Sequence, residues 1–342
     1  MKRSLLISVL AATAVTLLCT SCGGSKVGRA PVRDLVLIYD GGEHRTVKWN
    51  AEQFADYVAT DGETPEWLFD GFLFLEIHSG TGLSYASGYT PTPARKQDWI
   101  TLIDKYLTPG RDIAALNECV GTMRERIPGP FHRRKIVLSL PEPIPGQTDW
   151  GEIDGRSLDC KWYIDLLIER FTAAGLDNLQ LCGFYWLAEE ATNTRTFVAE
   201  VSDYIHEKGL DFYWIPYFKS DGYDQWRELG FDKAYLQPNH FFNDAIPDSR
   251  IDETCRLATQ AGMSLEMEFD ENALQQNGRG SRMKAYIDSY ERNGIFDNND
   301  LAYYQGNNAF SLLRHGTAED RALYERLASI IARRQKEFYG KR

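Results

Sequence analysis

Residues 198–218 read VAEVSDYIHEKGLDFYWIPYF and contain the repeating unit that decides the fold. Val201 and Ile205 lie one helical turn apart on the same apolar face, and Gly209 follows as the residue that ends the helix. The aromatic run at residues 212–218 has the composition of a buried strand. A helix that leads directly into an apolar strand is half of the unit that builds parallel sheets.

The same alternation extends in both directions along the chain. Further helices are expected to end at glycines that shortly precede a strand, namely Gly175, Gly262 and Gly294. Eight strands are expected in total, at residues 35–39, 72–77, 136–140, 179–186, 212–218, 234–237, 265–269 and 302–305. Eight units at a spacing of roughly 30 residues predict a single-domain (β/α)8 barrel, the TIM-barrel fold, over residues 34–342.

An open, doubly wound α/β sheet is the alternative architecture. That fold expects a glycine-rich phosphate-binding loop after the first strand. The chain instead continues YDGGE at residues 39–43, which lacks that spacing. The longest connection follows the second strand and contains a loop at residues 79–93 and two helices. We expect this insertion to wall the mouth of a cleft.

The N-terminus has the pattern of an export signal. An apolar run at residues 5–18 follows a basic start and is too short to span a membrane comfortably. Residues 18–22, LCTSC, resemble a lipobox, which implies cleavage before Cys22 and lipidation of its thiol. We expect a signal peptide at residues 1–21, a tether at residues 22–33, and a lipid-anchored protein of the bacterial cell envelope that faces the periplasm. An ordinary secretory signal is the alternative.

The composition limits the classes of partner and cofactor that we expect the protein to bind. The net charge is −11 and basic residues do not cluster, so we expect no nucleic-acid partner. The sequence lacks zinc-binding histidine motifs, a Walker loop and a nucleophile elbow, so we expect neither a metal nor a cofactor. Four widely spaced cysteines follow the signal and are expected to be buried free thiols: Cys119, Cys160, Cys182 and Cys255. The oligomeric state is left open.

Polar and aromatic side chains close nearly every predicted strand. In (β/α)8 barrels the carboxyl ends of the strands form the active site. The residues expected to bind a ligand there are Asp40, Glu76, His78, Trp186, Tyr217, Asn239, Glu266, Asp270 and Gln305.

The seventh strand and its end read LEMEFD at residues 265–270. Side chains alternate between the two faces of a strand, so Glu266, Glu268 and Asp270 share one face. If the apolar face packs on the helices, three carboxyl groups point into the barrel, where burial would perturb their pKa values. The alternative is an edge strand with a solvated acidic face.

The fourth strand is followed by Glu189 and Glu190, which should lie at the barrel mouth. Strict alternation from Cys182 and Trp186 turns Glu190 inward. An early exit of the chain from the strand would favour Glu189 instead. Either carboxylate could also simply stabilise the N-terminus of the following helix.

Acidic residues after strands 4 and 7 resemble the superfamily of retaining glycosidase barrels, which includes cellulases and β-galactosidases. The resemblance implies that Glu189 is the acid/base and Glu268 the nucleophile, with Glu190 and Asp270 as rivals. Where that superfamily often has Asn before the strand-4 Glu, this chain has Ala188. Residues 183–186, GFYW, and the Glu after them also resemble a family of bacterial lipoproteins described as domain of unknown function 4855.

Two carboxyl groups suffice to cleave a glycosidic bond, because one protonates the leaving oxygen and the other attacks the anomeric carbon or activates water. We therefore expect a glycoside hydrolase acting on a glycan or a small carbohydrate, contacting the membrane only through its anchor. The alternatives are a carbohydrate-binding or scaffolding lipoprotein without catalysis and a metal-dependent barrel enzyme.

Overall fold

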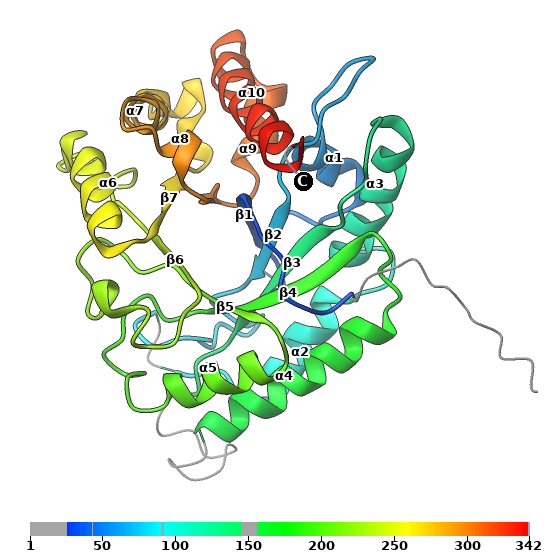
Figure 1. Cartoon of the computed structure of the whole chain (residues 1–342), viewed down its shortest axis with the longest axis vertical. Coiled ribbons are helices and arrows are strands. Elements are labelled where there is room, and N and C mark those ends of the chain that lie inside the picture. The colour runs from blue at the N-terminus through cyan, green and yellow to red at the C-terminus, as the bar shows by residue number, and fades with distance from the viewer. Residues whose placement is uncertain (1–25, 43, 90–91, 145–155, 341–342) are drawn as a thin grey trace, which may run out of the picture.

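The computed structural model describes residues 26–42, 44–89, 92–144 and 156–340. Eight parallel strands close into one barrel in chain order, with the helices around them (Figure 1). Closure excludes the open doubly wound sheet, because β1 pairs with β8 as well as with β2. The expected signal peptide, the lipidated Cys22 and the first part of the tether lie outside the described residues.

Each predicted strand overlaps an observed one. The strands are β1 (Asp34–Tyr39), β2 (Gly71–Leu75), β3 (Arg134–Leu140), β4 (Leu179–Trp186), β5 (Asp211–Trp214), β6 (Lys233–Leu236), β7 (Ser264–Glu268) and β8 (Leu301–Tyr304). β5 ends earlier than we predicted, shortly before Pro216, which has no N–H to donate to a ladder.

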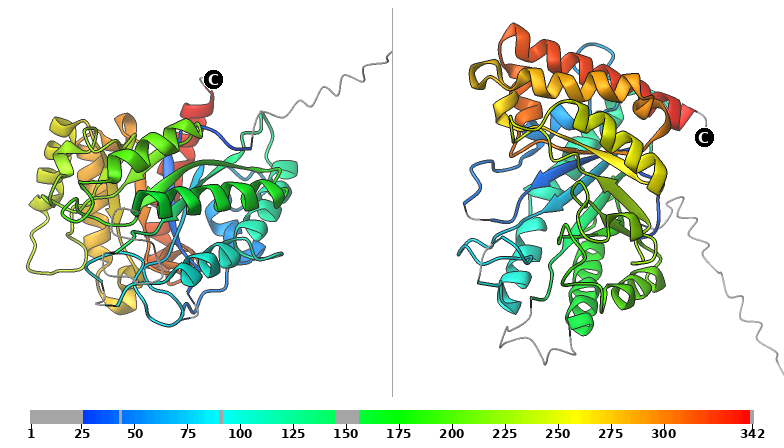
Figure 2. Two further views of the ribbon diagram at one scale, coloured as in Figure 1. Left: turned by 90° about the horizontal axis from the view of Figure 1, so that it is seen from below. Right: turned by 90° about the vertical axis from the view of Figure 1, so that its left-hand side faces the viewer.

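The helices connect these strands in sequence. They are α1 (Ala51–Val58), α2 (Lys96–Tyr106), α3 (Asp112–Arg126), α4 (Arg156–Ala173), α5 (Val198–Glu207), α6 (Ser249–Ala261), α7 (Gly280–Arg292), α8 (Ile295–Asn298), α9 (Ala309–His315) and α10 (Ala318–Gly340). The described residues also form short 3-10 turns, namely η2 (Tyr223–Gln225), η3 (Glu271–Ala273) and η4 (Gln275–Asn277). α7 and α10 run side by side on one flank of the barrel (Figure 2).

The connection from β5 to β6 differs from the expected strand–helix unit, since it contains η2 in place of an α-helix. Phe231 stacks on Trp214 there, with ring centroids 4.8 Å apart. Aromatic side chains thus cover this part of the barrel, where a helix was expected.

Local sequence signals explain where the helices begin and end. Asn50 caps α1 in a reciprocal capping box with Gln53. Gly262 ends α6 with φ of 62°, a left-handed conformation that glycine adopts without strain. Thr317 and Asp320 exchange hydrogen bonds at the start of α10.

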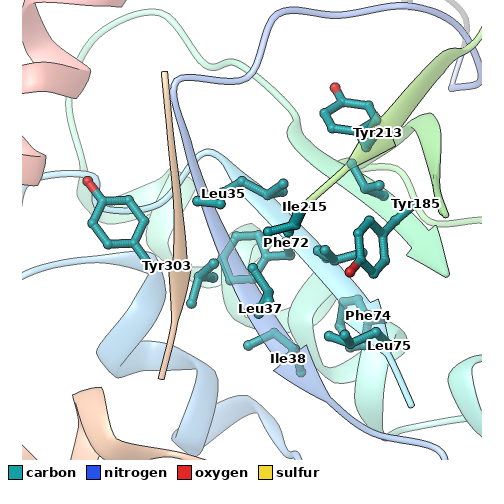
Figure 3. Close-up of a cluster of buried hydrophobic side chains, with 14 of the residues drawn as sticks. Leu35, Leu37, Ile38, Phe72, Phe74, Leu75, Tyr185, Tyr213, Ile215 and Tyr303 are labelled. Atoms are coloured by element: carbon teal, nitrogen blue, oxygen red, sulfur yellow. The ribbon is translucent and has the colours of Figure 1, made fainter. Parts of the chain in front are cut away.

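A bulge in β4 decides which side chains of that strand enter the barrel. Ile136 of β3 pairs with Leu181, but the next residue pairs with Gly183, so Cys182 is left without a partner in the ladder. One extra residue reverses the alternation of inward and outward side chains. Beyond the bulge Tyr185 points into the barrel interior (Figure 3). Trp186 packs against Phe197, directly before α5, and against Phe212 of β5.

The N-terminal end of the barrel is closed by residues of the predicted tether. The backbone N–H of Gly28 donates to Leu181 over 3.0 Å, and that of Arg29 donates to Gly209 over 2.8 Å. Val32 is fully buried. The segment from residue 26 to residue 33 is therefore packed on the barrel rather than free.

The four cysteines of the described chain are buried and free, as predicted. Among the described helices, none combines the length and apolarity needed to cross a membrane.

Candidate active site

A cavity of about 250 Å³ opens at the carboxyl ends of the strands. Its walls are Leu37, Tyr39, Leu75, Ile77, Tyr89, Tyr185, Leu187, Glu189, Ile215, Tyr217, Gln237, Asn239, Phe242, Glu266, Glu268 and Tyr304. Three carboxyl groups face aromatic and aliphatic side chains in this set, which contains neither Lys nor Arg. The volume is near the lower end of the range for small-molecule sites.

Glu189 reaches the cavity because of the bulge in β4. Tyr185, Leu187 and Glu189 alternate on the inward side, and all three line the cavity. Burial raises the pKa of Glu189 above its ordinary value, and Glu190 beside it adds to the shift. Side-chain hydrogen bonds with Gln237 and Tyr89 oppose it. Burial therefore favours the protonated form of the Glu189 carboxyl group.

Glu268 is buried at the end of β7. Its Oε2 accepts a hydrogen bond of 2.5 Å from the hydroxyl of Tyr286 and one of 3.2 Å from the backbone N–H of His240. Burial raises the pKa of Glu268 to about 7, although both hydrogen bonds lower it. The carboxylate is therefore fixed in orientation and titrates near neutral pH.

Glu266 lies two residues before Glu268, on the same face of β7, and also lines the cavity. It is 2% exposed, and burial together with Glu268 raises its pKa well above the ordinary value. These effects favour the protonated form of Glu266, which can donate a hydrogen bond. The alternation read from LEMEFD holds for these two residues, and their shifted pKa values agree with the perturbation we predicted.

The rival carboxylates lie outside the cavity walls. Glu190 accepts a hydrogen bond of 2.8 Å from Tyr217, which does line the cavity. Asp270 accepts hydrogen bonds from the backbone and side chain of Asn272 and caps η3. Asn239, also a wall residue, has φ of 51°, and its backbone N–H lowers the pKa of Glu268.

Glu76 and His78 belong to a separate polar group. Arg45 binds both oxygens of Glu76, each over 2.6 Å, so this carboxylate is neutralised by an ion pair. The ring centroids of His78 and His44 are 6.5 Å apart, and Nε2 of His44 lies 3.8 Å from Oε1 of Glu76. The pKa of His78 is lowered by burial.

Asp40, Trp186 and Gln305 were expected at the ligand, and the structure places them elsewhere. Burial raises the pKa of Asp40 to about 7, and its neighbour Asp112 adds to the shift. Trp186 faces the helices because of the bulge. Gln305 is fully buried and bonds to Tyr57 and to the backbone of β1, which makes it a structural residue.

Several wall residues were missed by reading strand ends alone. Tyr185 was missed because the bulge reverses its side, and Tyr304 because β8 turns Tyr303 toward Asp34 at the opposite end. Tyr89 comes from the long insertion after β2, for which we predicted a wall without naming a residue. Tyr286 of α7 does not line the cavity, but it binds Glu268, and no strand pattern points to it.

Within the described part of the chain, no group of three or more His, Cys, Asp or Glu side chains is arranged to hold a metal ion.

A family model for the domain of unknown function DUF4855 matches residues 34–329. The chain belongs to this family. The match confirms the resemblance read from GFYW and the following Glu, and it begins where β1 begins. A search of curated proteins gives no match to this DUF4855 chain.

The solved structures that match the DUF4855 chain do so at very low identity. A variant of the tryptophan synthase α-subunit from Pyrococcus furiosus has 9% identity and a TM-score of 0.39, with 90% of this chain and 98% of that chain covered. A xylanase-α-amylase inhibitor protein in complex with trehalose has 8% identity and a TM-score of 0.40, with 89% and 97% covered. Tryptophan synthase from M. tuberculosis has 11% identity and a TM-score of 0.40, with 88% and 93% covered.

Proposed function

We propose that this DUF4855 protein is a glycoside hydrolase that uses Glu189 and Glu268. The observation that supports this most is the presence of carboxyl groups from β4 and β7 in one aromatic cavity without a neutralising Lys or Arg among its described walls. Glu76 shows the contrast, since Arg45 pairs with both of its oxygens.

The two carboxyl groups suit different tasks. Glu189 has a raised pKa and lies toward the mouth, where a departing group would leave, so we assign it proton donation to the leaving oxygen. Glu268 is held by Tyr286 and a backbone N–H, so its ionised form is oriented to attack the anomeric carbon or to activate water. Aromatic walls such as Tyr89, Tyr185 and Tyr304 offer apolar surface for a sugar ring.

A panel of aryl glycosides and oligosaccharides tests the proposal. Residues 26–342 should release sugar from at least one member, and Glu268→Gln should abolish that release while keeping the circular dichroism spectrum. Glu190→Gln is the matched control. If the folded wild type binds a carbohydrate without cleaving it, the protein is a carbohydrate-binding protein, which is the second function that this cavity supports.

The location of the protein is a separate proposal. A lipid on Cys22 would join the barrel through residues 26–33, which pack at the N-terminal ends of the strands. The cavity is at the opposite end, so the anchored protein would present it away from the membrane, toward glycans of the envelope. Membrane fractionation of the full chain beside a Cys22→Ala variant tests this. Equal recovery of both in the soluble fraction would contradict it.

A further inference from the structure

A second cavity lies at the N-terminal end of the barrel, opposite Glu189 and Glu268. It measures about 650 Å³ and lies between the segments that lead into β2 and β3 and the last turns of α10. Apolar walls include Pro65, Pro128 and Ala332, and polar ones include Arg134, Gln335 and Lys336. None of these residues takes part in the proposed hydrolysis.

Arg134 is the unusual feature of this cavity. Its side chain lines the cavity yet is 1% exposed, and its Nε and Nη1 atoms have no hydrogen-bond partner among the described residues. Its guanidinium lies 4.1 Å from the ring centroid of Trp67. An arginine stays charged even when buried, so leaving two of its buried nitrogens without hydrogen bonds is costly unless an anion completes the site.

A second buried arginine at the same end of the barrel differs from Arg134 because its guanidinium nitrogens have hydrogen-bond partners. Arg334 is also 1% exposed, but it donates to Asp34 over 2.7 Å and to backbone carbonyls of Arg33 and Asn299. Burial lowers the pKa of Arg134, and the charges of Tyr339 and Asp70 oppose this shift. The oxygens of Asp70 already accept bonds from Tyr339 and two backbone N–H groups.

Two further polar side chains of the cavity, Gln335 and Lys336, can also contact a ligand bound at Arg134. Gln335 is 2% exposed, and its Oε1 has no partner among the described residues, so it can accept a hydrogen bond from a donor group on the organic part of the ligand but not from the anionic oxygens. Lys336 is exposed at the rim, where it adds positive charge, with Glu66 4.0 Å from its Nζ. The geometry points to a binding site for a small organic oxyanion, a carboxylate or phosphate ester whose charge pairs with Arg134 and whose apolar body contacts the proline-lined wall.

Calorimetric titration of residues 26–342 with phenyl phosphate and benzoate at low salt tests this site, with benzyl alcohol as the uncharged ligand of similar size. At least one anion should bind with a Kd of about 1 mM or below, and benzyl alcohol at least about tenfold more weakly. Phosphate-selective binding would identify a phosphate ester as the ligand, and carboxylate-selective binding a carboxylate.

Substitutions in the cavity then test whether the anion binds at Arg134. Arg134→Gln should weaken binding by about tenfold or more. Arg124→Gln is the matched control, since Arg124 stacks on Phe131 outside the cavity walls. If Arg134→Gln does not fold, the charge reversal Lys336→Glu at the exposed rim should weaken binding several-fold. Absence of anion binding by the folded wild type, or binding that neither Arg134→Gln nor Lys336→Glu weakens, would overturn the proposal.

Discussion

The hydroxyl of Tyr286 donates a hydrogen bond of 2.5 Å to Oε2 of Glu268. This links α7, outside the barrel, to a carboxyl group inside it. The bond stabilises the ionised form and therefore lowers the pKa of Glu268, which burial has raised to about 7. A group that must be ionised to act loses activity as the pH falls through its pKa. We expect kcat/KM to decline below about pH 7.

Removing the Tyr286 hydroxyl should move that decline. Tyr286→Phe takes away a bond that lowers the pKa of Glu268, so the acid limb of the kcat/KM profile should shift upward by about one pH unit. Tyr290→Phe is the control on the same helix, because its hydroxyl donates to the backbone carbonyl of Glu266 instead. An unchanged limb in Tyr286→Phe would show that Glu268 does not set it.

The bulge at Cys182 should make Glu189, rather than Glu190, the proton donor. Glu189→Gln should slow substrates with poor leaving groups by about 10²-fold or more and activated aryl glycosides much less, because only the former need the proton. Glu190→Gln should lose less than about threefold on both classes. Michaelis parameters across a leaving-group series check this. A stronger effect at Glu190 would assign the role to that residue.

Burial of Glu268 should cost stability at high pH. Its folded pKa of about 7 exceeds the ordinary 4.5, so the folded state binds the proton more tightly. That stabilisation is complete below pH 4.5 and is lost as the pH rises through 7. Glu268→Gln should therefore gain up to about 3 kcal/mol of unfolding free energy over wild type between pH 4.5 and pH 8.

Urea unfolding at several pH values measures this gain. Glu190→Gln is the control, being the same substitution at a partly exposed position. A difference between Glu268→Gln and wild type that is constant with pH would contradict the buried, uncompensated carboxyl group.

Gly183, directly after the bulged residue, should tolerate no side chain. A Cβ there would lie 2.3 Å from the backbone oxygen of Asp211 and 2.5 Å from the ring of Tyr213. Gly183→Ala should lower the unfolding free energy by about 1–3 kcal/mol. Gly340→Ala, where nothing lies within 4 Å, is the control. Wild-type stability in Gly183→Ala would mean that β4 can shift its register.

The barrel could be predicted because its signals are local. The stripe of α5, Gly209 and the aromatic run after it are contiguous, and each repeats in other units. The site was predictable where alternation is regular, as in β7, where Glu266 and Glu268 enter the cavity together.

The remainder depends on contacts between distant residues. The bulge at Cys182 exists only in the pairing of β3 with β4, and it reverses Tyr185 and Trp186. Arg45 neutralises Glu76 across residues that no strand pattern connects. Tyr286 meets Glu268 through the packing of α7, which a sequence period does not reveal.

The most direct test of the account is kcat/KM for wild type, Glu189→Gln, Glu268→Gln and the double variant on the best panel substrate that has a poor, unactivated leaving group. If the two residues act as a unit, each single change should cost about 10²–10⁴-fold, and the double variant should be little worse than the poorer single. Activity near wild type in Glu268→Gln, with the fold intact, would contradict the assignment of this cavity as the site of hydrolysis.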